Sequence, residues 1–374
     1  MSRRLLAFVC ALVFVDTALF AVIAPLLPFY SDEFGLSKAQ AGLLVAAYPA
    51  GVIVGSLPAG RLVARFGVRA VAVVGLALLS VSSLAFGLAS QPALLDITRF
   101  AQGLASAASW TAGLAWLARE TPPDRSGERL GAAFSAAVAG ALLGPALGAA
   151  ARGVDPAIVF GLAAAVQASL IVWALREPAP SAGLPDAGWW ATLRERALLP
   201  GALTILLVGL FFGAVDVLVP LRLDALGAGG ATIGLAFAIT ALLEAAAGPT
   251  VGRIADRIGP LRPIQLSLGL GAIVTMLLPL PDSVPILVAL LAISGPILGS
   301  LFVPGMKLLS DGAEGAGLDQ GYAFAVANLA WATTQAGGAA GAGAIASASS
   351  DTVAYAFLAA TLALFCILAL TANR

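Results

Sequence analysis

The chain is 374 residues long, with 60% hydrophobic and only 11% charged residues, whereas a soluble domain carries about 25% charged residues to cover its surface. A soluble protein is therefore excluded, and the formal net charge of zero gives no basic field that would attract nucleic acid. Because the sequence has no histidine, it excludes Ser-His-Asp and Cys-His catalysis and histidine-ligated zinc, and we expect neither an enzyme nor a metal site.

Apolar runs of about 20 residues, each long enough to cross a hydrocarbon core of about 30 Å, recur along the whole chain. They predict an all-α membrane protein with twelve transmembrane helices in two six-helix halves. The predicted spans are 5–28, 40–60, 69–89, 93–117, 130–150, 156–175, 198–220, 231–251, 262–280, 284–305, 321–345 and 352–371. The predicted domains are an N-terminal half at 1–177, a proline-rich cytoplasmic linker at 178–197 and a C-terminal half at 198–374.

The distribution of Lys and Arg predicts the orientation. If the N-terminus is cytoplasmic, sixteen of the 20 basic residues fall on cytoplasmic segments, as the positive-inside rule requires. Lys38, Arg152 and Arg222 fall outside, and Arg99 lies within a predicted helix. We therefore expect a multi-pass protein of the cytoplasmic (inner) membrane with both termini in the cytoplasm.

The two halves share an internal repeat. Shifted by 192 residues, Leu26–Gly67 lies over Leu218–Gly259 without a gap. The first-half residues that meet identical ones are Leu26, Pro28, Asp32, Gly35, Ala39, Gly42, Leu43, Ala46, Gly60, Arg61, Arg65 and Gly67. Chance matches of Ala, Leu and Gly are expected in such a chain, but Arg, Pro and Asp in one register indicate duplication. Duplicated halves place a central site at the repeat interface.

Glycines and arginines gather between the second and third predicted helices of each half. The first copy has Gly60, Arg61, Arg65, Gly67 and Arg69, and the second has Gly252, Arg253, Asp256, Arg257 and Gly259. Glycines permit a tight turn and arginines stay hydrated, so a plain positive-inside anchor is one interpretation. The pattern G-x-x-x-D-R-x-G also resembles the loop signature of the major facilitator superfamily.

The two copies match this signature unequally. The second matches fully, whereas the first has Ala64 where the acid belongs. The resemblance implies a gating latch that the loop acid and arginines form against the opposite half. Our hypothesis is that Ala64 weakens closure of the cytoplasmic side, and an Ala64→Asp variant with unchanged inward and outward accessibility to thiol probes would disprove it.

Two further motifs extend the resemblance. Leu95-Asp-Ile-Thr-Arg99-Phe-Ala-Gln102-Gly103 is similar to the family motif L-x-x-x-R-x-x-Q-G of helix four. In the fifth predicted helix, a motif of small residues is similar to the antiporter motif G-x-x-x-G-P-x-x-x-G, and its members are Gly140, Gly144, Pro145 and Gly148. Small residues let helices pack closely and proline kinks a helix, so packing alone also explains the pattern. The resemblance is to the twelve-helix drug/proton antiporter branch.

Ionisable residues inside predicted spans are candidates for function, because removing a charge from water is costly. Asp16 lies midway along the first span, Glu244 lies in the eighth and Asp216 lies nearer the outer interface. Arg99 has Asp96 at i−3, so the two can pair on one helix face. The alternative for each is a static hydrogen bond or ion pair. Burial disfavours a charged carboxylate and water favours it, so an acid that alternates between dry and wet surroundings can load and release protons.

The resemblance places helices one, two, four, five, seven, eight, ten and eleven around a central cavity. Candidate cavity side chains on these helices are Trp110, Asn328, Trp331 and Gln335, although tryptophans also anchor helices at membrane interfaces. Aromatic rings beside acids suit lipophilic cations.

The expected function is secondary active transport, specifically proton-coupled efflux of small amphipathic or cationic compounds. The expected energy source is the proton gradient, without a cofactor, and the expected partners are a small-molecule substrate, protons and the lipid bilayer, for a monomer. Transport of a sugar or another metabolite, as an exporter or an uptake symporter, is the alternative within the fold. A membrane enzyme or a channel is disfavoured, because no nucleophile motif and no pore-loop filter is visible.

Overall fold

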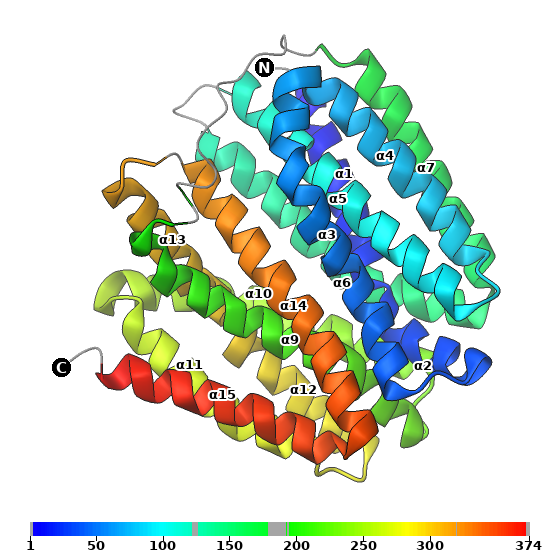
Figure 1. The fold of residues 1–374 in the computed structure, drawn as a ribbon, viewed down its shortest axis with the longest axis vertical. Coiled ribbons are helices and arrows are strands. Elements are labelled where there is room, and N and C mark those ends of the chain that lie inside the picture. The colour runs from blue at the N-terminus through cyan, green and yellow to red at the C-terminus, as the bar shows by residue number, and fades with distance from the viewer. Residues whose placement is uncertain (1–2, 122–125, 179–191, 193, 319, 372–374) are drawn as a thin grey trace. The chain divides into compact units, whose positions relative to one another are not determined.

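The computed structural model describes residues 3–121, 126–178, 192, 194–318 and 320–371, and no strand occurs among them (Figure 1). The helices are α1 (Arg3–Ala21), α2 (Ile23–Phe34), α3 (Lys38–Phe66), α4 (Val68–Gly87), α5 (Pro92–Glu120), α6 (Ser126–Gly153), α7 (Pro156–Arg176), η2 (Arg196–Leu198), α9 (Leu199–Ala225), α10 (Gly230–Ile258), α11 (Leu261–Leu277), α12 (Val284–Leu298), η3 (Gly299–Leu301), α13 (Phe302–Gly315), α14 (Gln320–Ala348) and α15 (Asp351–Thr371).

The predicted all-α membrane class is confirmed. Each of the twelve predicted spans coincides, within a few residues at its ends, with one helix or with two or three consecutive helical segments. Within the described residues, nine segments are long and apolar enough to cross a membrane by length and composition. The apolar helix α11 is shorter, at 17 residues, and α5 and α14 are not among the nine.

The first predicted span, 5–28, lies within one apolar segment, Arg3–Phe34, that is long enough to cross a membrane. The structure divides it into α1 and α2, with a turn at Val22, and continues the helix to Phe34. Pro25 follows three residues after the turn and has no N–H to donate to the carbonyl of Ala21. The break therefore lies where the helix already lacks one backbone hydrogen bond.

The glycine- and arginine-rich segments are mostly helical, which corrects the prediction that they are loops. α3 continues to Phe66 and α10 continues to Ile258, so each connection is little more than one residue. The turn residues are Gly67 and Gly259, with φ of 83° and 84°. Because a side chain is strained at such positive φ, these two positions require glycine in both copies of the repeat.

The described chain forms two compact units. One contains Met1–Phe29 and Ala47–Ala187, and the other contains Tyr30–Ala46 and Gly188–Arg374. The predicted linker at 178–197 lies largely outside the described residues, and the predicted domain limits stay a prediction.

The helices of each unit pack in the same order. In the first unit α1 packs on α6 and α4 packs on α7, and in the second unit α9 packs on α14 and α11 packs on α15 (Figure 1). Counted as predicted spans, these are pairs one–five and three–six, then seven–eleven and nine–twelve. The packing therefore repeats as the internal sequence repeat leads one to expect.

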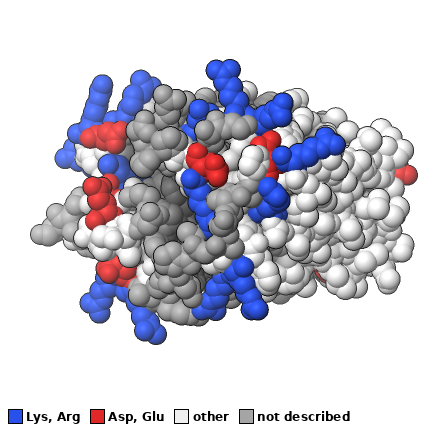
Figure 2. Space-filling model, turned by 90° about the horizontal axis from the view of Figure 1, so that it is seen from above, with Lys and Arg blue, Asp and Glu red and all other residues white. Residues whose placement is uncertain are grey.

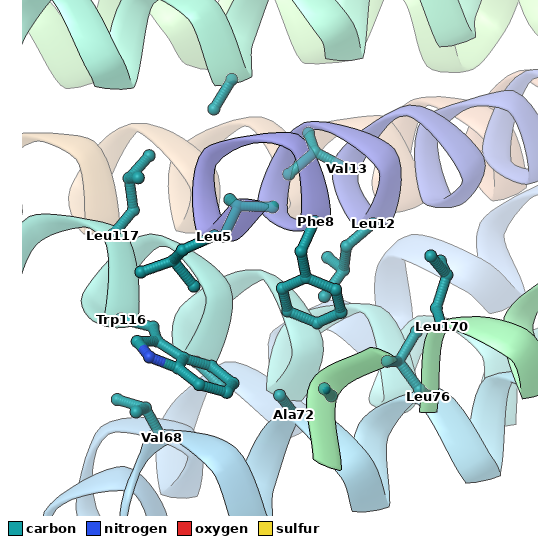
Figure 3. Close-up of a cluster of buried hydrophobic side chains, with 14 of the residues drawn as sticks. Leu5, Phe8, Leu12, Val13, Val68, Ala72, Leu76, Trp116, Leu117 and Leu170 are labelled. Carbon is teal, nitrogen blue, oxygen red and sulfur yellow. The ribbon is translucent and has the colours of Figure 1, made fainter. Parts of the chain in front are cut away.

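A cluster of large apolar side chains holds α1 in the first unit (Figure 3). Phe8 and Leu12 on α1 lie against Trp116 of α5, Leu76 of α4 and Leu170 of α7. The rings of Phe8 and Trp116 are 5.7 Å apart in an edge-on arrangement. This cluster fixes the part of α1 that leads to Asp16, which lies about one turn beyond Leu12.

The segment Tyr30–Ala46 belongs to the second unit through three close contacts. Lys38 forms an ion pair with Asp351 at the start of α15. The Ala39 N–H donates to Ser347 Oγ over 3.1 Å. A Cβ on Gly42 would lie 2.5 Å from the carbonyl oxygen of Ala339, so α3 and α14 can approach only because glycine occurs there.

The exterior is apolar over wide areas. Val81 and Phe357 are each 67% exposed, and such side chains occur along most of the helices. On the face in Figure 2 the charged side chains gather in one part, and a broad area beside them is almost uncharged. This surface fits a hydrocarbon environment and does not fit water.

Candidate functional site

The centre of the first unit is the carboxylate of Asp16, which is 3% exposed. Its Oδ2 atom accepts three hydrogen bonds, from Trp110 Nε1 at 2.6 Å, Ser106 Oγ at 2.7 Å and the Tyr48 hydroxyl at 3.2 Å. Its Oδ1 atom has no hydrogen-bond partner within the part of the chain that the structure describes. The two oxygens are thus unequal: one is saturated with donors, and the other can take a proton.

Glycines bring the surrounding helices close to Asp16. Added Cβ atoms on Gly140, Gly144 and Gly148 of α6 would lie 2.2, 2.6 and 2.2 Å from three carbonyl oxygens, those of Phe14 and Ala18 on α1 and that of Val22 at the turn after it. In the same way, a Cβ on Gly103 of α5 would lie 1.9 Å from the carbonyl oxygen of Tyr48. The small residues of both motifs therefore serve close helix packing around the acid, as their spacing predicted.

Arg99 is 1% exposed and supports the break between α1 and α2. Its guanidinium donates to the carbonyl of Leu19 at 2.8 Å, to that of Phe20 at 2.6 Å and to Gln102 Oε1 at 3.0 Å. The last carbonyls of a helix have no partner within the helix, and a planar guanidinium can bind two of them together.

The guanidinium also stacks over the ring of Tyr48, with 4.7 Å from Cζ to the ring centroid. Asp96, the partner predicted from its i−3 position, is half-buried, and the Arg99–Asp96 pair stays a prediction. Arg99 thus links the end of α1 to Tyr48, which donates to Asp16.

Sequence reasoning found Asp16, Trp110 and Arg99 but missed Tyr48 and Ser106. Ser106 could have been found, because it lies four residues before Trp110 and therefore on the same face of α5. No local pattern marks Tyr48, which lies 32 residues from Asp16 on another helix.

The second unit has its own polar group. Asp216 on α9 accepts a hydrogen bond from Gln335 Nε2 on α14 at 3.3 Å. Asp216 also lies near enough to Glu244 on α10 for the two carboxylates to interact electrostatically. Of the other cavity candidates, Trp331 is half-buried and Asn328 is exposed. The structure therefore joins three of the predicted residues that are far apart in sequence.

The charged residues of the repeated motif lie at the helix ends. Asp256 is 3.8 Å from Lys307 of α13, which also lies 3.5 Å from Asp311. Arg253 donates to the Pro249 carbonyl of its own helix, at 3.2 Å. Ala64, at the position of the missing acid, is half-buried on α3. A latch against the opposite half and an effect of Ala64 stay predictions.

The sequence of this chain matches a known protein family. The family model of the Major Facilitator Superfamily matches residues 9–222 and 201–373. The chain belongs to the Major Facilitator Superfamily. Members of this superfamily are membrane transporters and not enzymes, and this chain is accordingly a multi-pass membrane transporter.

Two similar fungal proteins carry the name MFS-type transporter ppzB. The protein of Metarhizium rileyi (strain RCEF 4871) is 30% identical over 127 residues, which are 33% of this chain and 26% of that protein. The protein of Metarhizium majus (strain ARSEF 297) is 28% identical over 128 residues, 33% of this chain and 28% of that protein. The match thus spans about a quarter of the length of these curated relatives.

Solved structures of the superfamily share the fold over nearly the whole chain. The nucleoside transporter NupG has a TM-score of 0.79 at 10% identity, with 99% of each chain covered. A bacterial homolog of the human lysosomal transporter Spinster, inward-facing and unoccupied, has a TM-score of 0.77 at 15% identity, with 99% and 96% covered. A POT family transporter in complex with 5-aminolevulinic acid has a TM-score of 0.78 at 16% identity, with 98% and 95% covered. At these identities the likeness establishes the Major Facilitator Superfamily fold and leaves the substrate open.

Proposed function

We propose that this chain is a proton-coupled antiporter that exports small amphipathic or cationic compounds. The observation that carries the proposal is the buried Asp16 carboxylate, with three donors on Oδ2 and, among the described residues, no hydrogen-bond partner for Oδ1. Burial favours the neutral acid, and the three donors favour the carboxylate, so small changes in hydration decide between the two forms. A group balanced in this way can bind a proton in one state of the transporter and release it in the other.

The second carboxylate group completes the coupling. Asp216 and Glu244 interact electrostatically, and two neighbouring carboxylates resist carrying two negative charges. A proton relieves this repulsion when no substrate is bound, and a substrate cation relieves it otherwise. Exchange of one for the other is the simplest form of antiport.

The cellular setting belongs to the same proposal. We place the chain in the cytoplasmic (inner) membrane with both termini in the cytoplasm, since sixteen of the 20 basic residues then fall on cytoplasmic segments. We further propose that it works as a monomer and uses the proton gradient as its energy source, without a cofactor.

Transport into inverted membrane vesicles tests the proposal. A pH gradient, acid inside, is imposed, and uptake of cationic dyes, sugars and amino acids is screened. We expect gradient-driven uptake of cationic dyes by the wild type, and we expect Asp16→Asn and Glu244→Gln each to abolish the dependence on the gradient. The control is Asp282→Asn, which removes an acid whose side chain is 92% exposed and pairs with Arg222, so full activity is expected.

Two outcomes would overturn the proposal. Full gradient dependence in both Asp16→Asn and Glu244→Gln would rule out the carboxylate mechanism. Gradient-driven movement of sugars or other neutral metabolites, with no movement of cations, would favour the alternative of a metabolite transporter with the same fold.

A further inference from the structure

The polar group of the second unit differs from the Asp16 site in the kind of hydrogen-bonding atoms it offers. Around Asp16, the neighbouring hydroxyls and the indole N–H are donors that already bind the acid. In the second unit, Asp216 and Glu244 contribute carboxylate oxygens, which in the ionised form are acceptors and never donors. The first group supplies three donors to one oxygen of its acid, and the second group consists mainly of acceptors.

Gln335 provides a separate observation at this site. Its side chain is fully buried, at 0% exposure. The amide nitrogen donates to Asp216 Oδ2, and this bond fixes the orientation of the amide because a carboxylate needs a donor. The amide oxygen, Oε1, then has no hydrogen-bond partner among the described residues. A buried carbonyl oxygen without a donor needs an explanation, and this one belongs to an amide held by a carboxylate, whereas the equally unpartnered Oε1 of Gln167 belongs to an amide that donates to a serine.

Gly299 makes room for the carboxylate of Glu244. A Cβ on Gly299 would lie 2.2 Å from Cδ of Glu244 and 2.4 Å from its Oε1. Gly299 begins η3, the short 3-10 segment between α12 and α13. The carboxylate therefore lies directly against the backbone at a helix break, in space that any other residue would fill.

Within the described residues of this unit, Lys38, Arg222 and Lys307 form ion pairs with acids other than Asp216 and Glu244. Arg222 pairs with Asp282 at 2.9 Å, and Lys307 lies beside Asp256 and Asp311. A ligand that satisfies two carboxylates and one amide oxygen has to be positively charged and to carry several donors. A protonated amine has both properties, whereas a quaternary ammonium has the charge and no N–H.

We propose that Asp216, Glu244 and Gln335 form a binding site for an ammonium group that bears N–H bonds, so that the exported compounds are primary or secondary amines. This inference rests on the proposed export of cationic compounds and narrows it. In the bound state the ammonium N–H groups donate to the two carboxylates and to Gln335 Oε1. The site thereby selects amines against quaternary cations of the same shape and charge.

Binding of a matched pair of probes tests this site without any transport. The purified full chain in detergent is titrated calorimetrically with 4-phenylbutylamine and with its N,N,N-trimethyl analogue. We expect the wild type to bind the primary amine at least about tenfold more tightly, since hydrogen bonds to a charged group are lost with the methyl groups. Gln335→Leu should reduce that preference by about tenfold and should leave the analogue nearly unaffected.

Gly299→Ala gives a second test that removes no polar group. Its Cβ would meet the end of a flexible side chain, so the protein can accommodate it by moving the Glu244 carboxylate. We expect weaker binding of the primary amine in a folded protein. The matched controls are Gln167→Leu, another fully buried glutamine, whose Nε2 lies 3.4 Å from Ser83 Oγ, and Gly337→Ala, where an added Cβ meets open space. Both controls should bind as the wild type does.

Equal affinity of the wild type for the two probes would overturn the inference, whatever the variants do. An unchanged preference in folded Gln335→Leu and Gly299→Ala proteins would also overturn it. The proposed antiport fails on different grounds, because it requires gradient-driven uptake that depends on Asp16. If quaternary cations are exported and their export depends on Asp16, the proposed antiport stands and the amine-selective site is wrong.

Discussion

The indole of Trp110 donates its N–H to Oδ2 of Asp16 over 2.6 Å, the shortest of the three hydrogen bonds to that oxygen. The ring of Trp110 is also 6.2 Å from that of Phe134 on α6, which helps to hold its orientation. The acid and its donor come from α1 and α5, two helices that a cluster of apolar side chains packs together. Trp110 is therefore a positioning residue for the proposed proton site.

Removal of this donor should change the pH profile of transport. Trp110→Phe keeps an aromatic ring and deletes the N–H, so the ionised form of Asp16 loses a hydrogen bond and becomes less stable relative to the neutral acid. We expect the alkaline limb of the gradient-driven transport profile to move to higher pH by roughly one unit. The measurement is the initial rate in inverted vesicles over a series of internal and external pH values.

The control for this change is Trp173→Phe. Trp173 of α7 donates its indole N–H to Glu177 Oε1 at 3.0 Å, outside the Asp16 site, so its loss should leave the profile in place. If the pH profiles of Trp110→Phe and the wild type coincide, the hydrogen bond from Trp110 has no part in proton binding.

Arg99→Lys should destabilise the protein although it conserves the charge. The lysine ammonium lacks the rigid planar fork with which the guanidinium holds the carbonyls of Leu19 and Phe20, and it cannot stack flat over Tyr48. We expect the free energy of unfolding to fall by about 1–3 kcal/mol in a reversible micelle-unfolding assay. Arg253→Lys, whose side chain bonds the exposed end of its own helix, should change little. An equal loss in the two variants would contradict the role given to Arg99.

Gly140→Ala should force α1 and α6 apart. The added Cβ would lie 2.2 Å from the carbonyl oxygen of Phe14, which is backbone and cannot rotate away. We expect a loss of about 1–3 kcal/mol of stability, as for other overpacked interiors, measured as a lower thermal midpoint in detergent. Gly153→Ala at the end of the same helix meets open space and should be neutral. Equal midpoints for the two variants would mean that the helices are not in contact at Gly140.

The ion pair of Lys38 with Asp351 should contribute a modest coupling energy. The two side chains are 39% and 18% exposed, so solvent screens their attraction only in part. A double-mutant cycle with Lys38→Met and Asp351→Asn should give about 0.5–1 kcal/mol, decreasing at high salt. The more exposed pair of Arg222 with Asp282 should give less. Additive effects of Lys38→Met and Asp351→Asn would show that the contact between α3 and α15 contributes nothing.

Some of the site could be predicted from particular residues. Asp16 and Glu244 could be identified because a charge inside an apolar run is costly and therefore indicates a function. Gly144 and Pro145 could be identified because they belong to a motif of small residues that recur along one helix. The break at Val22 was not predicted, because Pro25 is tolerated within many transmembrane helices and the broken form is stabilised by Arg99, 80 residues away from Leu19.

Composition and periodicity by themselves determined the helical membrane class, the duplicated halves and the acids worth testing, because hydrophobicity and repeat register are properties of neighbours along the chain. The tertiary structure decided the partners: Tyr48 and Ser106 around Asp16, and Gln335 beside Asp216. Hydrogen bonds between helices depend on which faces pack together. That packing follows from the close approach of glycines such as Gly140 and Gly213 to backbone far away in sequence, and no local pattern specifies it.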